Sequence, residues 1–162
     1  MRISALDSAG ARREAEWIVE IEPWRSLGYE RRRLGAWLAR RAQDDRVYCA
    51  RVGPVTVGII AARRDVLLGD FIALLAVRPE AARRGVGRSL VGHVAARTRR
   101  RHRWLYASSD SANRPAARFY RRLGFERVGR LPDLIRPGRT EILFRRKASG
   151  RPSGRTTGRA KR

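Results

Sequence analysis

The sequence has one cysteine, two lysines and no long apolar run, and each shortage excludes a class of structure. Cys49 has no second cysteine to pair with, so no disulfide forms within the 162-residue chain, and we expect it to be a small buried residue of a strand. No stretch of about 18 apolar residues occurs, so no transmembrane helix is predicted. The first residues lack the apolar core of a signal peptide, which favours a cytoplasmic location without membrane association.

The charge of the chain is strongly unbalanced. It has 38 basic and 15 acidic residues, a net charge of +23, and every basic residue except Lys147 and Lys161 is arginine. Such a surface predicts nonspecific affinity for polyanions. Because the sequence has no zinc-ligand spacing, recognition-helix pattern or aromatic-interleaved basic strand, specific nucleic-acid binding is the least favoured hypothesis. This Arg, Ala and Gly usage is also typical of a GC-rich genome, which would explain part of the charge.

Hydrophobic periodicity predicts a mixed α/β (α+β) chain in the order β-α-α-β-β-β-α-β-α-β-β. The expected strands cover 1–6, 46–52, 55–63, 69–77, 104–108, 125–131 and 140–146, and the expected helices cover 8–22, 30–42, 86–101 and 114–123. We expect one folded domain over residues 1–147. Residues 148–162 contain no apolar residue larger than alanine, which predicts a disordered basic tail.

The most informative segment is residues 77–90. A buried strand is predicted to end at Val77, and a short basic loop containing Gly85 and Gly87 precedes the next helix. A strand, a glycine-containing turn and a helix N-terminus form an anion site, because unpaired backbone N–H groups and the helix dipole point to one place. The predicted ligand is therefore a phosphorylated cofactor. Three arginines add positive charge around it: Arg83, Arg84 and Arg88.

Two other kinds of phosphate loop are excluded by their residues. A nucleotide P-loop requires Lys followed by Ser or Thr after its second glycine, whereas Arg88 and Ser89 follow Gly87. The dinucleotide fingerprint requires a third glycine three positions after the second, and that position is Leu90.

The loop resembles the acetyl-CoA loop of the GNAT N-acetyltransferases. In that family a strand ends in a hydrophobic-Val-x-Pro phrase, and Arg/Gln-x-x-Gly-x-Gly/Ala follows. Val77-Arg78-Pro79 matches the phrase, and Gly85-Val86-Gly87 matches the glycines. The departure is Ala82, where the family usually has Arg or Gln. The two arginines that follow Ala82 are placed to supply the lost side-chain contact.

A second segment, residues 113–126, resembles the family's Asn-x-x-Ala-x-x-Phe-Tyr-x-x-x-Gly-Phe signature. Asn113 predicts a helix cap, Pro115 suits the first turn, and Gly124 predicts a left-handed C-terminal turn. The resemblance covers residues 46–147 well and the preceding residues loosely. It implies a mixed, mostly antiparallel central sheet flanked by helices and splayed at the acetyl-CoA site.

The resemblance also implies which residues bind acetyl-CoA. Pantetheine would lie in the splay like a partial strand and, with the acetyl carbonyl, bond the backbone of Leu74, Leu75 and Val77, and the N–H of Leu75 would face the developing oxyanion. The loop and the cap of the 114–123 helix complete the site. The residues implied are Leu75, Ala76, Val77, Arg83, Arg84, Gly85, Val86, Gly87, Arg88 and Asn113.

For catalysis, Tyr120 matches the family's tyrosine that donates to the departing thiolate. A phenol of pKa near ~10 protonates a thiol of pKa ~8.5 at a cost of roughly 2 kcal/mol. The alternative is a core tyrosine with a satisfied hydroxyl. No acid lies between Phe71 and Val77, so Asp70 is the nearest candidate base, with a surface turn residue as the alternative. Residues 108–110, Ser-Ser-Asp, are predicted at the facing strand end, where they can hold a water.

The acceptor site is expected between the first two helices and residues 132–139. Glutamates at 14, 16, 20, 22 and 30, with Trp17, Trp24 and Tyr29 among them, suggest an acidic, aromatic mouth for a cationic amine or a peptide N-terminus. The alternative, favoured equally or more, is a solvated helix face whose acids pair with Arg12, Arg13 and Arg25. The sequence does not identify the acceptor.

The leading hypothesis is an acetyl-CoA-dependent N-acetyltransferase. It would move the acetyl group to a primary amine, of a small molecule or a peptide, by direct attack in a ternary complex. Ala82 and the missing strand acid leave open a CoA-binding protein of this fold without turnover. A basic nucleic-acid-binding protein is the third hypothesis. A homodimer is left open, and no metal site is predicted.

Overall fold

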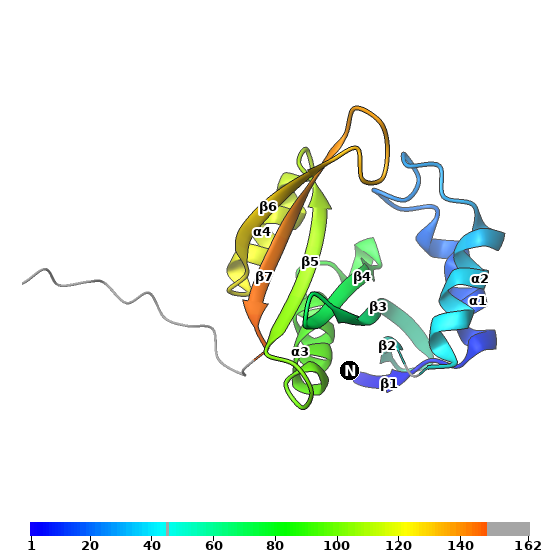
Figure 1. The fold of residues 1–162 in the computed structure, drawn as a ribbon. Coiled ribbons are helices and arrows are strands. Elements are labelled where there is room, and N and C mark those ends of the chain that lie inside the picture. The colour runs from blue at the N-terminus through cyan, green and yellow to red at the C-terminus, as the bar shows by residue number, and fades with distance from the viewer. Residues whose placement is uncertain (45, 149–162) are drawn as a thin grey trace, which may run out of the picture.

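The computed structural model describes residues 1–44 and 46–148, which form one seven-stranded sheet with helices on both faces (Figure 1). The strand order is β1-β2-β3-β4-β5-β7-β6, and only β4 and β5 run parallel to each other. The strands are β1 (Arg2–Ala5), β2 (Val47–Val52), β3 (Val55–Val66), β4 (Gly69–Val77), β5 (Trp104–Asp110), β6 (Glu126–Pro132) and β7 (Thr140–Lys147). The mixed, mostly antiparallel sheet predicted from the sequence is confirmed.

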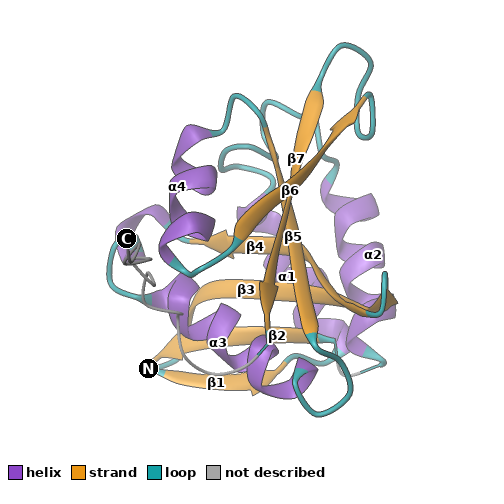
Figure 2. Ribbon diagram, turned by 60° about the vertical axis from the view of Figure 1, so that its left-hand side comes forward, coloured by secondary structure: helices purple, strands orange, loops and turns teal. Residues whose placement is uncertain are grey.

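Two pairs of helices cover the two faces of the sheet (Figure 2). On one face, α1 (Ser8–Ile18) and α2 (Arg31–Ala42) pack through Ile18 and Leu38 onto apolar side chains of β2, β3 and β4. On the other face, α3 (Val86–Thr98) and α4 (Arg114–Arg122) pack through Leu90 and Tyr120 onto a second core. A short 3-10 helix, Pro79–Ala81, joins β4 to the loop before α3. The order of elements matches the sequence prediction.

The first helix is shorter than predicted. Asp7 caps its start by accepting a hydrogen bond from the N–H of Gly10 at 2.6 Å, but the helix ends at Ile18 rather than near residue 22. Residues 19–28 form turns that contain Pro23 and the left-handed Gly28, with φ of +66°. Pro23 has no N–H to donate to the carbonyl of Val19, so it disfavours continuation of α1 through this segment.

The sheet opens between β4 and β5. Their parallel pairing runs from Gly69↔Trp104 to Ile72↔Ala107 and ends there. At the same place β3 pairs Ala61 with Leu74 and Ala62 with Ile72, so Ala73 is an extra residue in β4. Such a β-bulge bends a strand and increases its local twist. The second half of β4 therefore departs from β5, which confirms the predicted splay (Figure 1).

The bulge also changes which face each β4 side chain meets. Ile72, before the bulge, packs in the α3–α4 core. Leu74, only two residues later, packs in the α1–α2 core. In a regular strand, residues two apart share a face, so the change of face marks the inserted Ala73.

The chain beyond β7 continues the fold by one residue. Ala148, which the sequence assigns to the tail, is 1% exposed, and its N–H donates to the carbonyl of Arg103 at 2.8 Å. The rest of the predicted tail, residues 149–162, lies outside the described residues. Among the helices of the described ranges, none combines the length and apolar character that a membrane span requires.

Gly58 lets α3 lie close to the sheet. A Cβ placed on Gly58 in β3 would lie 2.7 Å from Cγ1 of Val86 and 3.0 Å from Cδ1 of Leu90, both on α3. We predict that Gly58→Ala lowers the free energy of unfolding by about 1–3 kcal/mol, the usual cost of overpacking. The control is Gly129→Ala on β6, where the nearest heavy atom to a Cβ is 3.8 Å away. Equal urea midpoints for the two variants would contradict this packing role.

Candidate active site

Three connected pockets follow the opening between β4 and β5. The loop-side pocket, about 450 Å³, is lined by Val77, Arg83, Gly85, Gly87, Arg88 and Tyr120. The central pocket, about 160 Å³, is lined by Tyr29, Leu75, Ser108, Asn113, Tyr120 and Glu141. The outer pocket, about 460 Å³, is lined by Trp24, Tyr29, Arg33, Trp37, Leu74 and Arg136. Leu75 and Tyr120 border the first two pockets, and Tyr29 and Leu74 border the last two, so the three form one passage through the sheet.

The register of β3 and β4 determines which backbone groups face this passage. The N–H of Arg78 donates to the carbonyl of Val57, and this pair continues the antiparallel register of Gly58↔Val77. Hydrogen-bonded and non-hydrogen-bonded pairs alternate along such a ladder. Leu74 and Ala76 therefore bond to β3, whereas the N–H and C=O groups of Leu75 and Val77 point to the opening. The backbone groups of Leu75 and Val77 are therefore open to the passage, and their contact with the cofactor stays a prediction. The backbone groups of Leu74 and Ala76 are directed to β3, so the expected contacts of these two residues with the cofactor are wrong for the backbone.

The same reasoning applies to β5 on the opposite side. Ser111 donates its N–H to the carbonyl of Thr140, which continues the β5–β7 register of Asp110↔Glu141. The backbone groups of Ser108 and Asp110 consequently point away from β7 and toward the opening. Two strand edges with unpaired donors and acceptors face each other there, and an extended polar group fits between them.

The predicted anion loop has the expected conformation. Arg83 and Gly85 both have left-handed φ values, +62° and +79°, and α3 begins at Val86. The first N–H groups of α3 therefore face the loop-side pocket together with the positive end of the helix dipole. Gly87 has a further role, because a Cβ there would lie 3.1 Å from the ring of Phe119. Arg83 and Arg88 line the pocket, whereas Arg84 is exposed beside it.

Asn113 and Tyr120 lie at the two ends of α4. Asn113 caps the helix, as predicted, by accepting from the N–H of Ala116 at 3.1 Å, and it borders the central pocket. Tyr120 is 6% exposed and is held among the rings of Phe119, Phe125 and Phe144, with centroid distances of 5.3–5.5 Å. Burial, and then the charge of Glu141, raise the pKa of Tyr120 well above its usual value near 10. Its hydroxyl therefore keeps its proton and acts as a hydrogen-bond donor.

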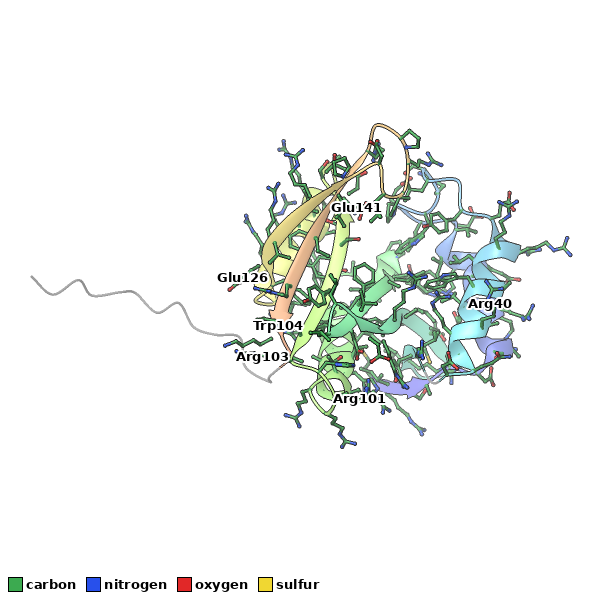
Figure 3. All side chains as sticks on the ribbon, in the orientation of Figure 1. Arg40, Arg101, Arg103, Trp104, Glu126 and Glu141 are labelled. Atoms are coloured by element: carbon green, nitrogen blue, oxygen red, sulfur yellow. The ribbon has the colours of Figure 1, made fainter. Side chains whose placement is uncertain are left out.

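Glu141 is the acid that the sequence reasoning missed. It is 7% exposed, near the upper end of β7 and below the β6–β7 loop (Figure 3). Burial raises the pKa of this carboxyl, and the charge of Asp110 adds to the effect. A hydrogen bond from Ser108 and the charge of Arg139 oppose it. The signal in the sequence was a single acid next to the apolar run Ile-Leu-Phe of the last strand.

Asp110 is the strand neighbour of Glu141 in the β5–β7 ladder. Its carboxylate accepts from Nε of Arg139 at 2.7 Å and from the N–H of Ala112 at 2.7 Å. Burial acts to raise the pKa of Asp110, but these two hydrogen bonds outweigh it and the pKa is lowered. The pKa values of these two neighbouring acids therefore shift in opposite directions. Asp110 stays ionised and paired, whereas Glu141 holds a proton more readily.

Asp70, the predicted base, is not brought to the passage. It lies before the bulge, 2% exposed, and its Oδ2 accepts from Oγ1 of Thr98 at 2.8 Å and from Nη2 of Arg101 at 3.1 Å. Figure 3 shows Arg101 at the lower end of the molecule, far from Glu141 at the upper end. The alternative role, a residue of a surface turn, is also wrong, because Asp70 is buried within β4. Its contacts connect β4 to the end of α3.

Four of the five glutamates near the first two helices are engaged in hydrogen bonds or ion pairs. Glu22 contacts Arg25 at 3.2 Å and Ser26 at 2.6 Å, and Glu30 contacts Arg33 at 3.1 Å. Two more pairs are Glu14 with the indole N–H of Trp17 and Glu16 with Arg31. These contacts favour the helix-face alternative, although Arg31 and Arg33 take the place of Arg12 and Arg13. In the described ranges, Glu30 is the one member of this group that lines the outer pocket.

No cluster of three or more His, Cys, Asp or Glu side chains in the described part of the chain is placed to hold a metal ion. The passage combines a glycine-containing loop at a helix N-terminus, two open strand edges, and the buried side chains of Tyr120 and Glu141.

Comparisons with known proteins agree with this arrangement. Residues 43–127, just over half of the chain, match the family model described as Acetyltransferase (GNAT) domain. The peptidyl-lysine N-acetyltransferase YiaC of Escherichia coli is 36% identical over 64 residues, which are 40% of this chain and 41% of that protein. The aligned part thus spans less than half of the curated relative.

Solved structures share the fold over nearly the whole chain. An aminoglycoside 6'-N-acetyltransferase complexed with coenzyme A has a TM-score of 0.76 at 17% identity, covering 94% of this chain and 100% of the other. A ribosomal-protein-alanine N-acetyltransferase from Brucella melitensis has a TM-score of 0.73 at 18% identity, covering 91% and 99%. The family uses acetyl-CoA as its acyl donor. With the matching domain, the loop and the splayed sheet in place, this chain belongs to the GNAT family of acetyltransferases.

Proposed function

We propose that the protein transfers the acetyl group of acetyl-CoA to a primary amine by direct attack in a ternary complex, with Glu141 as base and Tyr120 as donor to the leaving sulfur. The observation that carries the proposal is the passage through the sheet. An anion-binding loop opens on one side and an aromatic pocket on the other, and Tyr120 and Glu141 border the central part. Acetyl-CoA supplies an activated thioester carbonyl to this position.

The loop and the open edge of β4 hold the donor in this scheme. The N–H groups at the start of α3, with Arg83 and Arg88, bind the pyrophosphate. The backbone of Val77 pairs with pantetheine as a neighbouring strand would. The N–H of Leu75 lies further along the same edge and faces the oxyanion, where such a donor contributes about 3 kcal/mol.

Glu141 prepares the nucleophile. An alkyl ammonium must lose a proton before its nitrogen attacks the thioester carbon, and a carboxylate with a raised pKa is a stronger base than an ordinary one. The hydrogen bond from Ser108 orients the carboxylate.

Tyr120 acts when the C–S bond breaks. Because the pKa of Tyr120 is raised, complete proton transfer from its hydroxyl to sulfur costs more free energy than transfer from a phenol of ordinary pKa. The hydroxyl therefore stabilises the departing thiolate by donating a hydrogen bond. The second proton of the attacking nitrogen, lost as the amide forms, then neutralises the thiolate. The bond that forms is N–C, and the bond that breaks is C–S.

Tyr120→Phe tests this donor. The variant keeps the ring that packs on Phe125 and Phe144 and removes only the hydroxyl, so acetyl-CoA affinity should change little while kcat falls about tenfold to 10²-fold. The control is Tyr106→Phe, a buried tyrosine that donates to the carbonyl of Leu67 away from the passage. Amine-dependent thiol release and calorimetric titration provide the two readouts. Normal turnover in Tyr120→Phe, with chemistry rate-limiting, would make Tyr120 a packing residue.

Glu141→Gln tests the base, because the variant should lose turnover without losing thermal stability. Turnover should fall about 10²-fold or more, and the loss of kcat as pH falls through the raised pKa of Glu141 should disappear. Because the folded-state pKa is raised, ionised Glu141 destabilises the fold at neutral pH. The variant should therefore melt at the same or a higher temperature. Exposed Glu126→Gln on β6 is the control. A fall in melting temperature with unchanged turnover would assign Glu141 a structural role.

A further inference from the structure

The outer pocket has the shape and lining of a site for the body of the acceptor. It has about 460 Å³ of space and joins the central pocket at Tyr29 and Leu74. Trp24, Tyr29 and Trp37 form its aromatic part, and Ile135 adds an apolar side chain from the β6–β7 loop. An amine whose nitrogen reaches Glu141 must place the rest of its structure on these side chains, since the loop-side pocket is needed for the cofactor.

The lining of this pocket carries more positive than negative charge, unlike a site that binds polycations. Two of its lining residues, Arg33 and Arg136, are cationic, and Glu30 is the acid among the described lining residues. Glu30 already contacts Nε of Arg33 at 3.1 Å. A second ammonium group on the acceptor would therefore meet arginines and a carboxylate that is already paired. Repulsion between these arginines and a second ammonium group would weaken the binding of a diamine relative to other amines.

The two arginines approach the pocket from separate elements. Arg33 comes from α2, and Arg136 comes from the β6–β7 loop, which reaches toward the α1–α2 connection (Figure 1). Arg136 is held there, since Nη2 donates to the carbonyl of Leu27. A guanidinium has five donors, so each retains donors for a ligand. Planar guanidinium groups bind carboxylates in a bidentate way that an ammonium does not reproduce.

We propose that the acceptor is a primary amine on an apolar or aromatic body that carries a carboxylate on the side away from the amine. The ammonium enters the central pocket between Tyr29 and Glu141, the body stacks on Trp24 and Trp37, and the carboxylate meets Arg33 and Arg136. This inference rests on the proposed acetyltransferase function. It also separates this chain from a polyamine or aminoglycoside acceptor, for which the outer pocket offers little negative charge.

The test uses three amines of matched size: 4-(aminomethyl)benzoate, benzylamine and 1,4-bis(aminomethyl)benzene. They differ in the group opposite the amine, which is anionic, neutral or cationic. The kcat/KM values, corrected for the free-amine fraction and for the two equivalent amines of the diamine, should fall in that order and span about tenfold. A parallel pair of peptides, Phe-Asp-Ala and Phe-Lys-Ala, determines whether the same preference extends to a peptide N-terminus or is confined to small molecules.

Variants separate a local effect from the overall positive charge. Arg33→Gln should reduce the ratio of kcat/KM between the benzoate and the diamine at least threefold. Arg32→Gln removes the same charge from an exposed neighbour on α2 outside the pocket lining and should preserve the ratio. Arg136→Gln, which leaves the Glu30–Arg33 pair intact, should also lower the ratio.

The outcomes distinguish the inference from the proposed function. Acetylation of benzylamine with the diamine equal or preferred would overturn the inference and leave the acetyltransferase proposal in place. Equal ratios in Arg33→Gln and Arg32→Gln would show a general field effect and overturn the assigned contacts. Binding of acetyl-CoA with no amine-dependent thiol release for any of the five acceptors would overturn the inference alone, whereas failure to bind acetyl-CoA would contradict the proposed function itself.

Discussion

One extra residue in a central strand determines most of this structure. Ala73 has no partner in the β3–β4 register, and the β4–β5 pairing ends at the residue before it. A sheet with regular pairing at this point would bond β4 to β5 along their whole length. The backbone N–H and C=O groups of Leu75, Val77 and Ser108 would then be hydrogen-bonded within the sheet. The bulge instead leaves two unpaired edges that converge on the central pocket. The proposed binding of pantetheine as a neighbouring strand, and the access from the opposite face, both depend on this single insertion.

The ionisable groups of the passage have pKa values that their surroundings shift in different directions. Asp110 is held ionised by Arg139, whereas the buried Glu141 beside it has a raised pKa, and its charge contributes to the raised pKa of Tyr120. Pairs of titratable groups whose environments move their pKa values apart are typical of acid–base sites. Within the passage, Arg139 pairs with Asp110, Arg83 and Arg88 line the loop-side pocket, and Arg33 and Arg136 line the outer pocket.

The sequence predicted the fold and the family, with its use of acetyl-CoA, because those features depend on local patterns, whereas the residues that contact the cofactor stay a prediction. The loop around Gly85 and the cap at Asn113 have signatures that extend over a few residues. The base was assigned to Asp70 because it is the nearest acid to the central strand along the chain. Glu141 reaches the site only through the pairing of β7 with β5, and Glu16 of α1 forms an ion pair with Arg31 of α2, which is distant along the chain. Long-range register of this kind leaves little trace in one sequence.

Leu75 and Val77 present an open backbone edge to the cofactor in the proposed complex, and amide hydrogen exchange measured by NMR reports on this edge residue by residue. In the free protein the amides of Leu75 and Val77 should exchange much faster than those of Leu74 and Ala76, which bond to β3. Saturating acetyl-CoA should slow Val77, Leu75 or both, and should affect Leu74 and Ala76 less. Equal protection of all four amides without ligand, or acetyl-CoA binding that leaves Leu75 and Val77 unchanged, would contradict the account.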